Sequence, residues 1–214
     1  MTNPKITALE PDPRRTGTVK VEIDEERFGS VPYEIAAAEG LAPGLPVSAE
    51  LRERLTRAAD EEAAYRTALR SLERRAFARY DLGRRLRRKG HPGHAVESAL
   101  EHAASLGLLD DAAFARNYVQ TRTARGRGPS RLVSDLLAMG VERSLIDRAV
   151  AAEWADADGP DRTDLPRALA VARAARLSGL PAPVKRRRLL AYLARRGFTG
   201  REVTDMVGGL MAGG

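Results

Sequence analysis

The stretch GLLDDAAFARNYVQTRTARGRGPSRLVSDLLAMG, residues 107–140, contains one predicted helix, an arginine-rich connection and the start of a second helix. Asp110 and Asp111 precede the first helix, where a carboxylate oxygen can accept a hydrogen bond from a free N–H group of the first turn. Phe114 and Tyr118 are four residues apart and therefore share one face of that helix. We predict a capped amphipathic helix here.

The second helix of this stretch has its own start and stop signals. Pro129 has the fixed backbone angle that suits a first helical turn, and Leu132 and Leu136 supply an apolar face. Gly140 marks the end, because glycine readily adopts the left-handed conformation that follows many helices. Residues 126–130, GRGPS, have two interpretations. Their N–H groups could contact a phosphate at the helix start, or they form an ordinary helix–helix connection.

The same helical pattern occurs three times along the chain. Gly90, Gly140 and Gly197 each follow leucines at minus eight and minus four and precede aliphatic residues at plus six and plus ten. This spacing is typical of two amphipathic helices joined by a tight glycine turn. A further helix is predicted before each pair, at residues 65–75, 112–124 and 165–177. Such repeats can stack only by sharing apolar faces, which predicts an elongated body.

The front part of the chain has a different pattern. Residues 19–23 alternate apolar and polar side chains, as in a half-buried strand, and residues 27–31 can return as a second strand. An isolated hairpin is marginal in water, so it must pack on the helices predicted at residues 33–39 and after Ser48. The predicted fold class is therefore mainly α: three tandem three-helix repeats preceded by a small N-terminal α/β module with a β-hairpin.

The predicted organisation has five parts. They are an N-terminal module at residues 1–63, repeat 1 at 64–109, repeat 2 at 110–154, a linker at 155–164 and repeat 3 at 165–214. The linker is acidic and contains a Gly-Pro pair.

Composition limits the class of protein. The chain has 214 residues, 43% of them hydrophobic, and no cysteine, so it can bury a core but cannot form a disulfide or a thiolate metal site. Charges interrupt every apolar run well before membrane-spanning length, and the first residues lack the apolar core of a signal peptide. We therefore expect a cytoplasmic protein without membrane contact.

The net charge of +7 is unevenly divided. Residues 1–63 carry 8 basic and 13 acidic side chains, a net of −5, whereas residues 64–214 carry a net of +12. A basic body suits a polyanionic partner. Abundant arginine, alanine and glycine also suggest GC-rich coding, which enriches arginine everywhere, so charge alone does not decide between these interpretations.

Three clusters of basic residues recur at related places in the repeats. A run of charge is usually a solvated helix face, but clusters at corresponding places favour one surface suited to a polyanion. Helical counting directs Arg84, Arg88, Arg187 and Arg195 away from the apolar faces. The candidate filament- or DNA-binding residues are Arg84, Arg85, Arg87, Arg88, Lys89, Arg122, Arg125, Arg127, Arg131, Lys185, Arg186, Arg187, Arg188, Arg195 and Arg196.

Catalysis and cofactor binding find little support in the sequence. His91 and His94 flank a Pro-Gly turn as exposed residues, without the cysteines or acids that would complete a zinc set. Asp110 and Asp111 fit helix capping far better than acid–base chemistry. No GxxxxGK[ST] loop is present, so the protein should not hydrolyse ATP. We predict a protein without enzymatic activity, metal or cofactor.

Base reading is also not expected. The helices that follow the glycine turns carry Glu97, Glu142 and Glu202 where a major-groove reader would place Asn, Gln or Arg. Aromatic residues are only 5% of the chain and are better explained as core, which argues against a base-stacking platform. Contact with a nucleic-acid backbone or with an acidic protein surface remains.

The central stretch also contains a recognisable set of residues. In chain order they read GLLDD, Phe114-Ala115, Tyr118-Val119, Arg122, Gly126, Gly128-Pro129, Arg131-Leu132 and Gly140. This motif resembles the RecX family of RecA regulators, and the resemblance covers most of the chain. It implies a helical protein that lies in the groove of the RecA–single-stranded-DNA filament. There it would inhibit the ATPase, coprotease and strand-exchange activities of RecA and favour filament disassembly.

Two functions are therefore compatible with the sequence. The first is a non-enzymatic regulator of the RecA filament in recombination, DNA repair and the SOS response. The alternative is a sequence-independent, architectural DNA-binding protein built from helix–turn–helix-like units. The first requires RecA with DNA as the partner, and the second requires DNA alone. In both, we expect a monomer whose direct DNA binding is weak.

Overall fold

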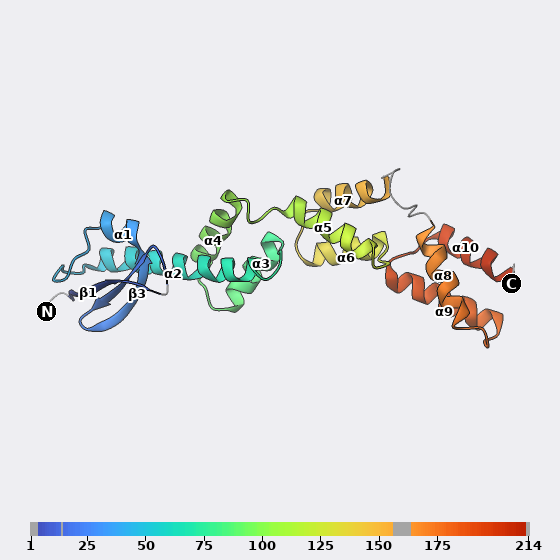
Figure 1. The fold of residues 1–214 in the computed structure, drawn as a ribbon, viewed down its shortest axis with the longest axis horizontal. Coiled ribbons are helices and arrows are strands. Elements are labelled where there is room, and N and C mark those ends of the chain that lie inside the picture. Colours follow the sequence, from blue (N-terminus) through green and yellow to red (C-terminus); the bar gives the residue numbers. More distant parts are fainter. Residues whose placement is uncertain (1–3, 14, 156–163, 213–214) are drawn as a thin grey trace. The chain divides into compact units, whose positions relative to one another are not determined.

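The computed structural model describes residues 4–13, 15–155 and 164–212 (Figure 1). The chain divides into two compact units, Met1–Leu109 and Asp110–Gly214. The first unit contains the N-terminal sheet and the helices of repeat 1. The second unit contains the helices of repeats 2 and 3. The mainly helical fold with a small N-terminal sheet confirms the predicted fold class.

The sheet has one strand more than the predicted hairpin. Strands β1 (Ile6–Pro11), β2 (Thr18–Ile23) and β3 (Glu26–Pro32) pair antiparallel in the order β1-β2-β3. Asp24 and Glu25 connect β2 to β3 with φ angles of 51° and 67°, the positive values that a type I′ hairpin turn requires at both central positions. The added strand β1 covers the other edge of β2 and so stabilises the hairpin.

One long helix belongs to both cores of the first unit. After α1 (Tyr33–Ala38), helix α2 (Ala49–Leu72) begins at Ser48, whose hydroxyl oxygen accepts a hydrogen bond from the Leu51 N–H at 3.1 Å. Leu51 and Leu55 pack against the sheet, whereas Ala64 and Ala68 pack with the helices of repeat 1. Figure 1 shows α2 running from the sheet to these helices. They are α3 (Arg79–Arg88) and α4 (Gly93–Ser105).

The second unit contains two further three-helix groups. Those of repeat 2 are α5 (Asp111–Thr123), α6 (Pro129–Ala138) and α7 (Arg143–Ala155). Those of repeat 3 are α8 (Leu165–Ala175), α9 (Ala182–Arg196) and α10 (Arg201–Ala212). Asp110 caps α5 by accepting a hydrogen bond from the Ala113 N–H at 2.8 Å, as predicted. Most of the linker predicted at residues 155–164 lies outside the described residues.

The glycine-centred repeat is confirmed by backbone conformation and by burial. Gly90, Gly140 and Gly197 have φ angles of 88°, 76° and 94°, in the left-handed region that favours glycine. The leucines at minus eight and minus four from each glycine are fully buried. They are Leu82, Leu86, Leu132, Leu136, Leu189 and Leu193. Each turn therefore joins two helices whose apolar faces meet in a local core.

Candidate anion-binding surface

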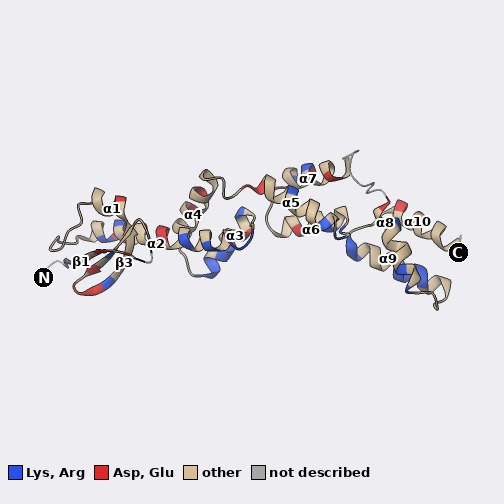
Figure 2. Ribbon diagram, in the orientation of Figure 1, with Lys and Arg blue, Asp and Glu red and all other residues tan. Residues whose placement is uncertain are grey.

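The predicted basic cluster of repeat 1 lies along α3 and at its C-terminal cap, and several of its residues are already engaged. Figure 2 shows the basic residues along α3. Arg84 forms an ion pair with Asp81 at 3.0 Å, and Arg87 forms one with Glu97 at 2.7 Å. Arg85 is half-buried and donates a hydrogen bond to the Ser71 hydroxyl at 3.2 Å. The charge of this cluster is therefore partly neutralised by the protein.

The remaining two residues of this predicted cluster are Arg88 and Lys89. Both are exposed, and neither forms an ion pair with a described residue. Arg84 and Arg88 point away from the apolar face of α3, as helical counting predicted. A polyanion could bind two unpaired charges here, because Asp81 and Glu97 already neutralise Arg84 and Arg87.

The structure brings basic residues of repeats 2 and 3 together in a single depression of about 390 Å³. We call it the arginine hollow. It is lined by Arg122, Arg125, Arg127, Tyr192, Arg195 and Arg196. The first three arginines come from the end of α5 and the connection to α6, and the other three residues come from the last turns of α9. The recurrence of the clusters suggested one shared basic surface, but sequence spacing did not identify which arginines of repeats 2 and 3 lie side by side.

Backbone contacts between two glycine-containing segments join repeat 2 to repeat 3 beside the hollow. The Gly128 N–H donates a hydrogen bond to the Arg196 carbonyl at 2.7 Å, and the Ser130 N–H donates one to the Gly197 carbonyl at 3.3 Å. A Cβ atom on Gly128 would lie 2.6 Å from the Gly197 carbonyl oxygen, which is too close for any other residue. The approach of these two backbones therefore requires glycine at position 128.

This contact also settles the two interpretations of residues 126–130. The N–H groups of Gly126 and Arg127 donate to carbonyl oxygens at the end of α5, and those of Gly128 and Ser130 donate to repeat 3. Pro129 has no N–H. The interpretation of this segment as a backbone phosphate cradle was therefore wrong, because its donors are occupied. The segment is instead a docking site for the end of α9.

Arg196 is held in place by contacts on both sides. Its Nη1 donates to the carbonyl oxygens of Arg125 at 2.9 Å and Gly126 at 3.3 Å. Its guanidinium lies over the Tyr192 ring, 5.1 Å from the centroid, in a cation–π contact. A Cβ atom on Gly126 would lie 2.6 Å from Nη1. Glycine at position 126 thus leaves the space that the Arg196 side chain fills.

A second aromatic ring supports the opposite wall of the hollow. The Arg122 guanidinium lies 5.2 Å from the centroid of the Tyr118 ring, and the Tyr118 hydroxyl donates a hydrogen bond to Asp135 at 3.2 Å. Burial, together with the negative charge of Asp135, raises the pKa of Tyr118. Asp135 also pairs with Arg131 at 2.9 Å and lies 3.9 Å from Arg127. This network orients Arg122 and Arg127 before any ligand arrives.

Positive charge in the hollow is largely uncompensated. Arg127 alone among its five arginines forms an ion pair with a described residue, and that pair is long, at 3.9 Å. No acidic side chain among the described residues lines the hollow. Guanidinium groups stay charged at physiological pH, and their planar forks match the oxygens of phosphate groups. The hollow therefore suits a multiply charged anion.

The other predicted cations of repeat 3 lie elsewhere on α9. Figure 2 shows the basic residues along this helix. Lys185, Arg186, Arg187 and Arg188 occupy its first half and do not line the hollow. Lys185 is half-buried and the three arginines are exposed. Arg195 is exposed as predicted, at the hollow itself.

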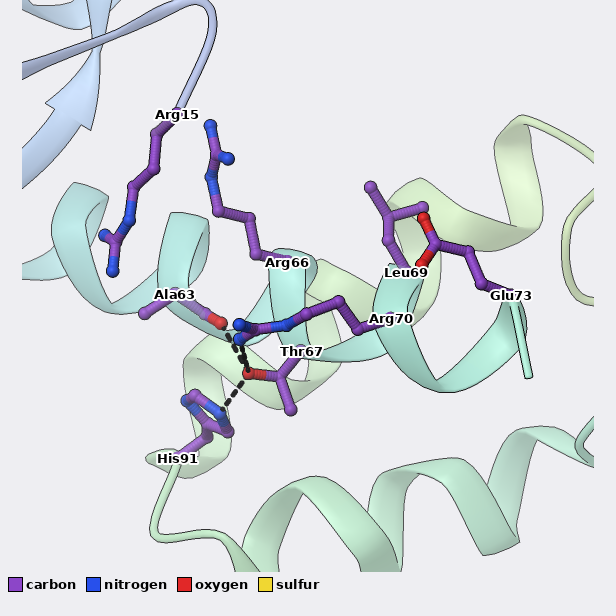
Figure 3. A pocket seen from close by; sticks show the side chains of 8 residues that line it. All are labelled: Arg15, Ala63, Arg66, Thr67, Leu69, Arg70, Glu73 and His91. Atoms are coloured by element: carbon purple, nitrogen blue, oxygen red, sulfur yellow. Dashed lines mark hydrogen bonds between the residues drawn. The ribbon is translucent and has the colours of Figure 1, made fainter. Parts of the chain in front are cut away.

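The first unit has a depression of about 530 Å³, shown in Figure 3. Its cations are engaged with the protein: Arg15 pairs with Asp12, and Arg66 pairs with Glu62 and donates to the Thr16 carbonyl at 3.2 Å. Arg70 also lines it and donates to the Thr67 hydroxyl at 3.3 Å (Figure 3). The arginines of this depression therefore connect the residues before β2 with α2, and few of their N–H donors are left for a ligand.

His91 lies in the same depression and corrects one prediction. It is half-buried rather than an exposed turn residue, and its ring nitrogen Nε2 lies 3.0 Å from the Thr67 hydroxyl (Figure 3). Burial is the main reason why the pKa of His91 is lowered, and the positive charges of Lys89 and Arg70 act in the same direction. The ring therefore has a structural role where the chain enters α4.

Two further observations concern other classes of site. Among the described residues, histidine and acidic side chains do not gather in groups of three that could hold a metal ion. The same part of the chain contains no helix with the length and apolar character needed to cross a membrane.

Fold and site together define a protein of tandem three-helix repeats with arginine-rich surfaces. Two family models match within it, the first three-helix domain of RecX at residues 64–102 and the second at residues 110–150. A regulatory protein RecX from Halorhodospira halophila is 39% identical over 150 residues, which are 68% of this chain and 86% of that relative. One from Mycobacterium marinum is 34% identical over 153 residues, 69% of this chain and 84% of the relative.

Solved structures show the same fold. A crystal structure of regulatory protein RecX has a TM-score of 0.74 at 22% identity and covers 96% of this chain and 99% of its own. RecX from Lactobacillus salivarius has a TM-score of 0.59 at 19% identity, over 72% of this chain and 97% of its own. With the sequence relatives, these findings show that the chain belongs to the RecX family of regulatory proteins, which confirms the resemblance.

Proposed function

We propose that this protein is a non-enzymatic regulator of the RecA–single-stranded-DNA filament. It would bind in the filament groove and limit the ATPase, coprotease and strand-exchange activities of RecA. The observation that carries the proposal is family membership, since the chain spans 86% of a relative that is named a regulatory protein. RecA as the partner is what the resemblance to this family implies.

The arrangement of the basic residues supports contact with a nucleic-acid backbone. Four of the five arginines in the hollow of the second unit, and the exposed Arg88 and Lys89 of the first unit, offer charge without an ion-pair partner among the described residues. Contacts of this kind recognise phosphate and carry no base information. A protein that follows a filament along any DNA sequence needs this kind of contact.

The helix starts that would read bases in a DNA-binding protein support the same conclusion. At α4, Glu97 pairs with Arg87 and lies 3.6 Å from Arg79. At α7 and α10, Arg143 and Arg201 each form an i, i+4 ion pair with an aspartate of the same helix. Their guanidiniums therefore already have partners. This favours the filament regulator over a sequence-reading module, and an architectural DNA-binding protein remains the alternative.

A titration of RecA's DNA-dependent ATPase tests the proposal. RecA and a poly-dT strand are held constant while the protein is added up to a molar excess over RecA. We expect the rate of ATP hydrolysis to fall well before the DNA is saturated by direct binding. An unchanged rate of ATP hydrolysis, at protein concentrations that saturate the same DNA in the absence of RecA, would favour the architectural alternative.

A further inference from the structure

We propose that the arginine hollow is a phosphate-binding site, and that a bound phosphate and the docking of repeat 3 on repeat 2 stabilise each other. The existence of this site does not depend on RecA. The nucleic-acid backbone as the source of the phosphate rests on the proposed function. The depression of the first unit is a weaker candidate, because its arginines are engaged with acidic or polar groups of the protein.

Electrostatic repulsion between the arginines is the first reason to expect a bound anion in the hollow. Five guanidiniums line one depression of about 390 Å³, and Arg122, Arg125 and Arg195 form no ion pair with any described residue. The groups cannot relieve the repulsion by losing protons, because guanidinium remains protonated. A high surrounding dielectric weakens the repulsion between like charges but does not abolish it. A bound anion would remove this cost.

Preorganisation is the second reason. Arg122 is held against the Tyr118 ring, and Arg196 is held against Tyr192 and two backbone carbonyls. The hydrogen bonds of Arg196 to described residues use Nη1, which leaves Nε and Nη2 for a ligand. Side chains that are already ordered lose less conformational entropy on binding. These arginines are therefore positioned to donate paired N–H hydrogen bonds to phosphate oxygens.

The origin of the lining residues couples the site to docking. Arg122, Arg125 and Arg127 belong to repeat 2, whereas Tyr192, Arg195 and Arg196 belong to repeat 3. The hollow is complete only while the Gly128 N–H is bonded to the Arg196 carbonyl and the two backbones are in contact. A ligand that binds only this docked state must stabilise it by mass action. Phosphate binding would therefore favour one fixed arrangement of the two repeats.

Phosphate fits the hollow better than a carboxylate does. A carboxylate has one negative charge and two oxygens, whereas phosphate groups present more oxygens, and pyrophosphate or adjacent backbone phosphates carry more charge. Arg122, Arg125 and Arg195 offer three unpaired guanidiniums, which exceeds what one carboxylate can satisfy. Arginine frequently binds phosphate through two parallel N–H donors. The predicted ligand is therefore a phosphate-rich anion rather than an acidic peptide.

Thermal unfolding of the full chain tests the site with sodium pyrophosphate as the probe and sodium chloride at equal ionic strength as the reference. The wild type should gain about 5 °C or more at saturating pyrophosphate. Arg125→Ala/Arg195→Ala should lose most of that gain. In chloride alone, this variant should unfold no earlier than the wild type, because both side chains are exposed and removing them relieves repulsion.

Arg116→Ala/Arg167→Ala is the matched control, because it removes two exposed arginines of the same unit that lie outside the hollow. It should keep the pyrophosphate gain. Equal gains in the wild type, the hollow variant and the control would overturn the proposal, because they would show general anion effects. A gain from poly-glutamate as large as that from pyrophosphate would also overturn it, in favour of an acidic protein ligand.

Two further probes identify the source of the phosphate. If the source is the nucleic-acid backbone, Arg125→Ala/Arg195→Ala should weaken the binding of a fluorescein-labelled dT oligonucleotide several-fold, and ATP should compete poorly. If a free nucleotide is the source, ATP should bind and the oligonucleotide affinity should not change. Either result supports the phosphate site. If the hollow does not bind phosphate, the ATPase titration with the wild type still tests separately whether the protein inhibits RecA.

Discussion

The backbone N–H of Gly128 and the backbone carbonyl of Arg196 form a 2.7 Å hydrogen bond between two repeats of the same unit. This bond places five arginines around one depression. Glycine is required at the contact because a Cβ atom on Gly128 would lie 2.6 Å from the next carbonyl, that of Gly197. A short backbone contact thus determines where the charge of repeats 2 and 3 is concentrated.

Gly197 caps the C-terminus of α9 and forms part of this contact. A Cβ atom there would lie 2.4 Å from the Arg131 backbone nitrogen, and its φ angle of 94° is unfavourable for other residues. Gly197→Ala should destabilise the second unit by at least the left-handed penalty of about 1–2 kcal/mol. The unfolding midpoint should fall by about 4 °C or more. Calorimetry against Gly179→Ala, where a Cβ meets open space, measures this, and equal midpoints would refute the docking contact.

Docking and phosphate binding should fail together in Gly128→Ala. This variant keeps all five arginines of the hollow but cannot bring the two backbones into contact, because its Cβ would meet both Gly197 and Phe198. We expect a smaller stabilisation by pyrophosphate than in the wild type, with helical content preserved by circular dichroism. If Gly128→Ala bound pyrophosphate as well as the wild type, the arginines would bind it without docking.

The sequence predicted the features that depend on local patterns. The caps at Ser48 and Asp110, the glycine turns and the buried leucines follow from spacings of a few residues. Strand β1 was harder to predict, because its pairing with β2 is what defines it. The contact between Gly128 and Gly197 was not predicted, because a tertiary contact of a glycine produces no pattern in the residues that flank it in the sequence.

The ion-pair partners of the predicted arginines could be derived from the sequence in some cases and not in others. The pairing of Arg84 with Asp81 was readable as an i, i+3 contact on α3. The ion pair of Arg87 with Glu97 connects two helices and could not be predicted from sequence spacing. The hollow has the same difficulty on a larger scale, because Arg125 and Arg195 are distant in sequence and meet only through docking. Charge clusters could be listed from the sequence, but their neutralisation required the structure.

The neutralisation on α3 predicts unequal roles for the clusters in direct DNA binding. Arg84→Ala/Arg87→Ala removes two arginines that already have acidic partners, whereas Arg125→Ala/Arg195→Ala removes two that have none among the described residues. Fluorescence anisotropy with a dT oligonucleotide should show the larger loss for the second pair. Its plot of log affinity against log salt should also flatten by about 1.4, since each phosphate contact contributes about 0.7. Equal losses would indicate that pairing does not matter.

Direct DNA binding without RecA should be weak and independent of sequence. The basis is the occupied helix starts, at which Arg143 and Arg201 pair with aspartates and do not offer free donors to base edges. Rounds of selection from a random duplex library should return no motif. A defined motif would promote the DNA-binding alternative over the filament regulator.

Stability should decrease below neutral pH through His91. Its folded-state pKa lies below the ordinary value of about 6.5, so the unfolded chain binds the proton more tightly. The contribution is therefore fully present above that value and is lost as pH falls through it toward the folded pKa. His91→Gln should flatten this part of the curve in chemical denaturation between pH 7.5 and pH 5. A wild-type curve that stays flat there, or one that His91→Gln leaves unchanged, would contradict the burial of this ring.

We propose that arginines presented by the repeats let this protein regulate RecA on DNA. The most direct measurement is inhibition of RecA's DNA-dependent ATPase by the wild type, by Arg125→Ala/Arg195→Ala and by the control Arg116→Ala/Arg167→Ala, with folding checked by circular dichroism. We expect inhibition by the wild type and the control at similar concentrations, and a several-fold higher half-inhibitory concentration for the hollow variant. Three indistinguishable inhibition curves, or no inhibition by the wild type, would contradict it.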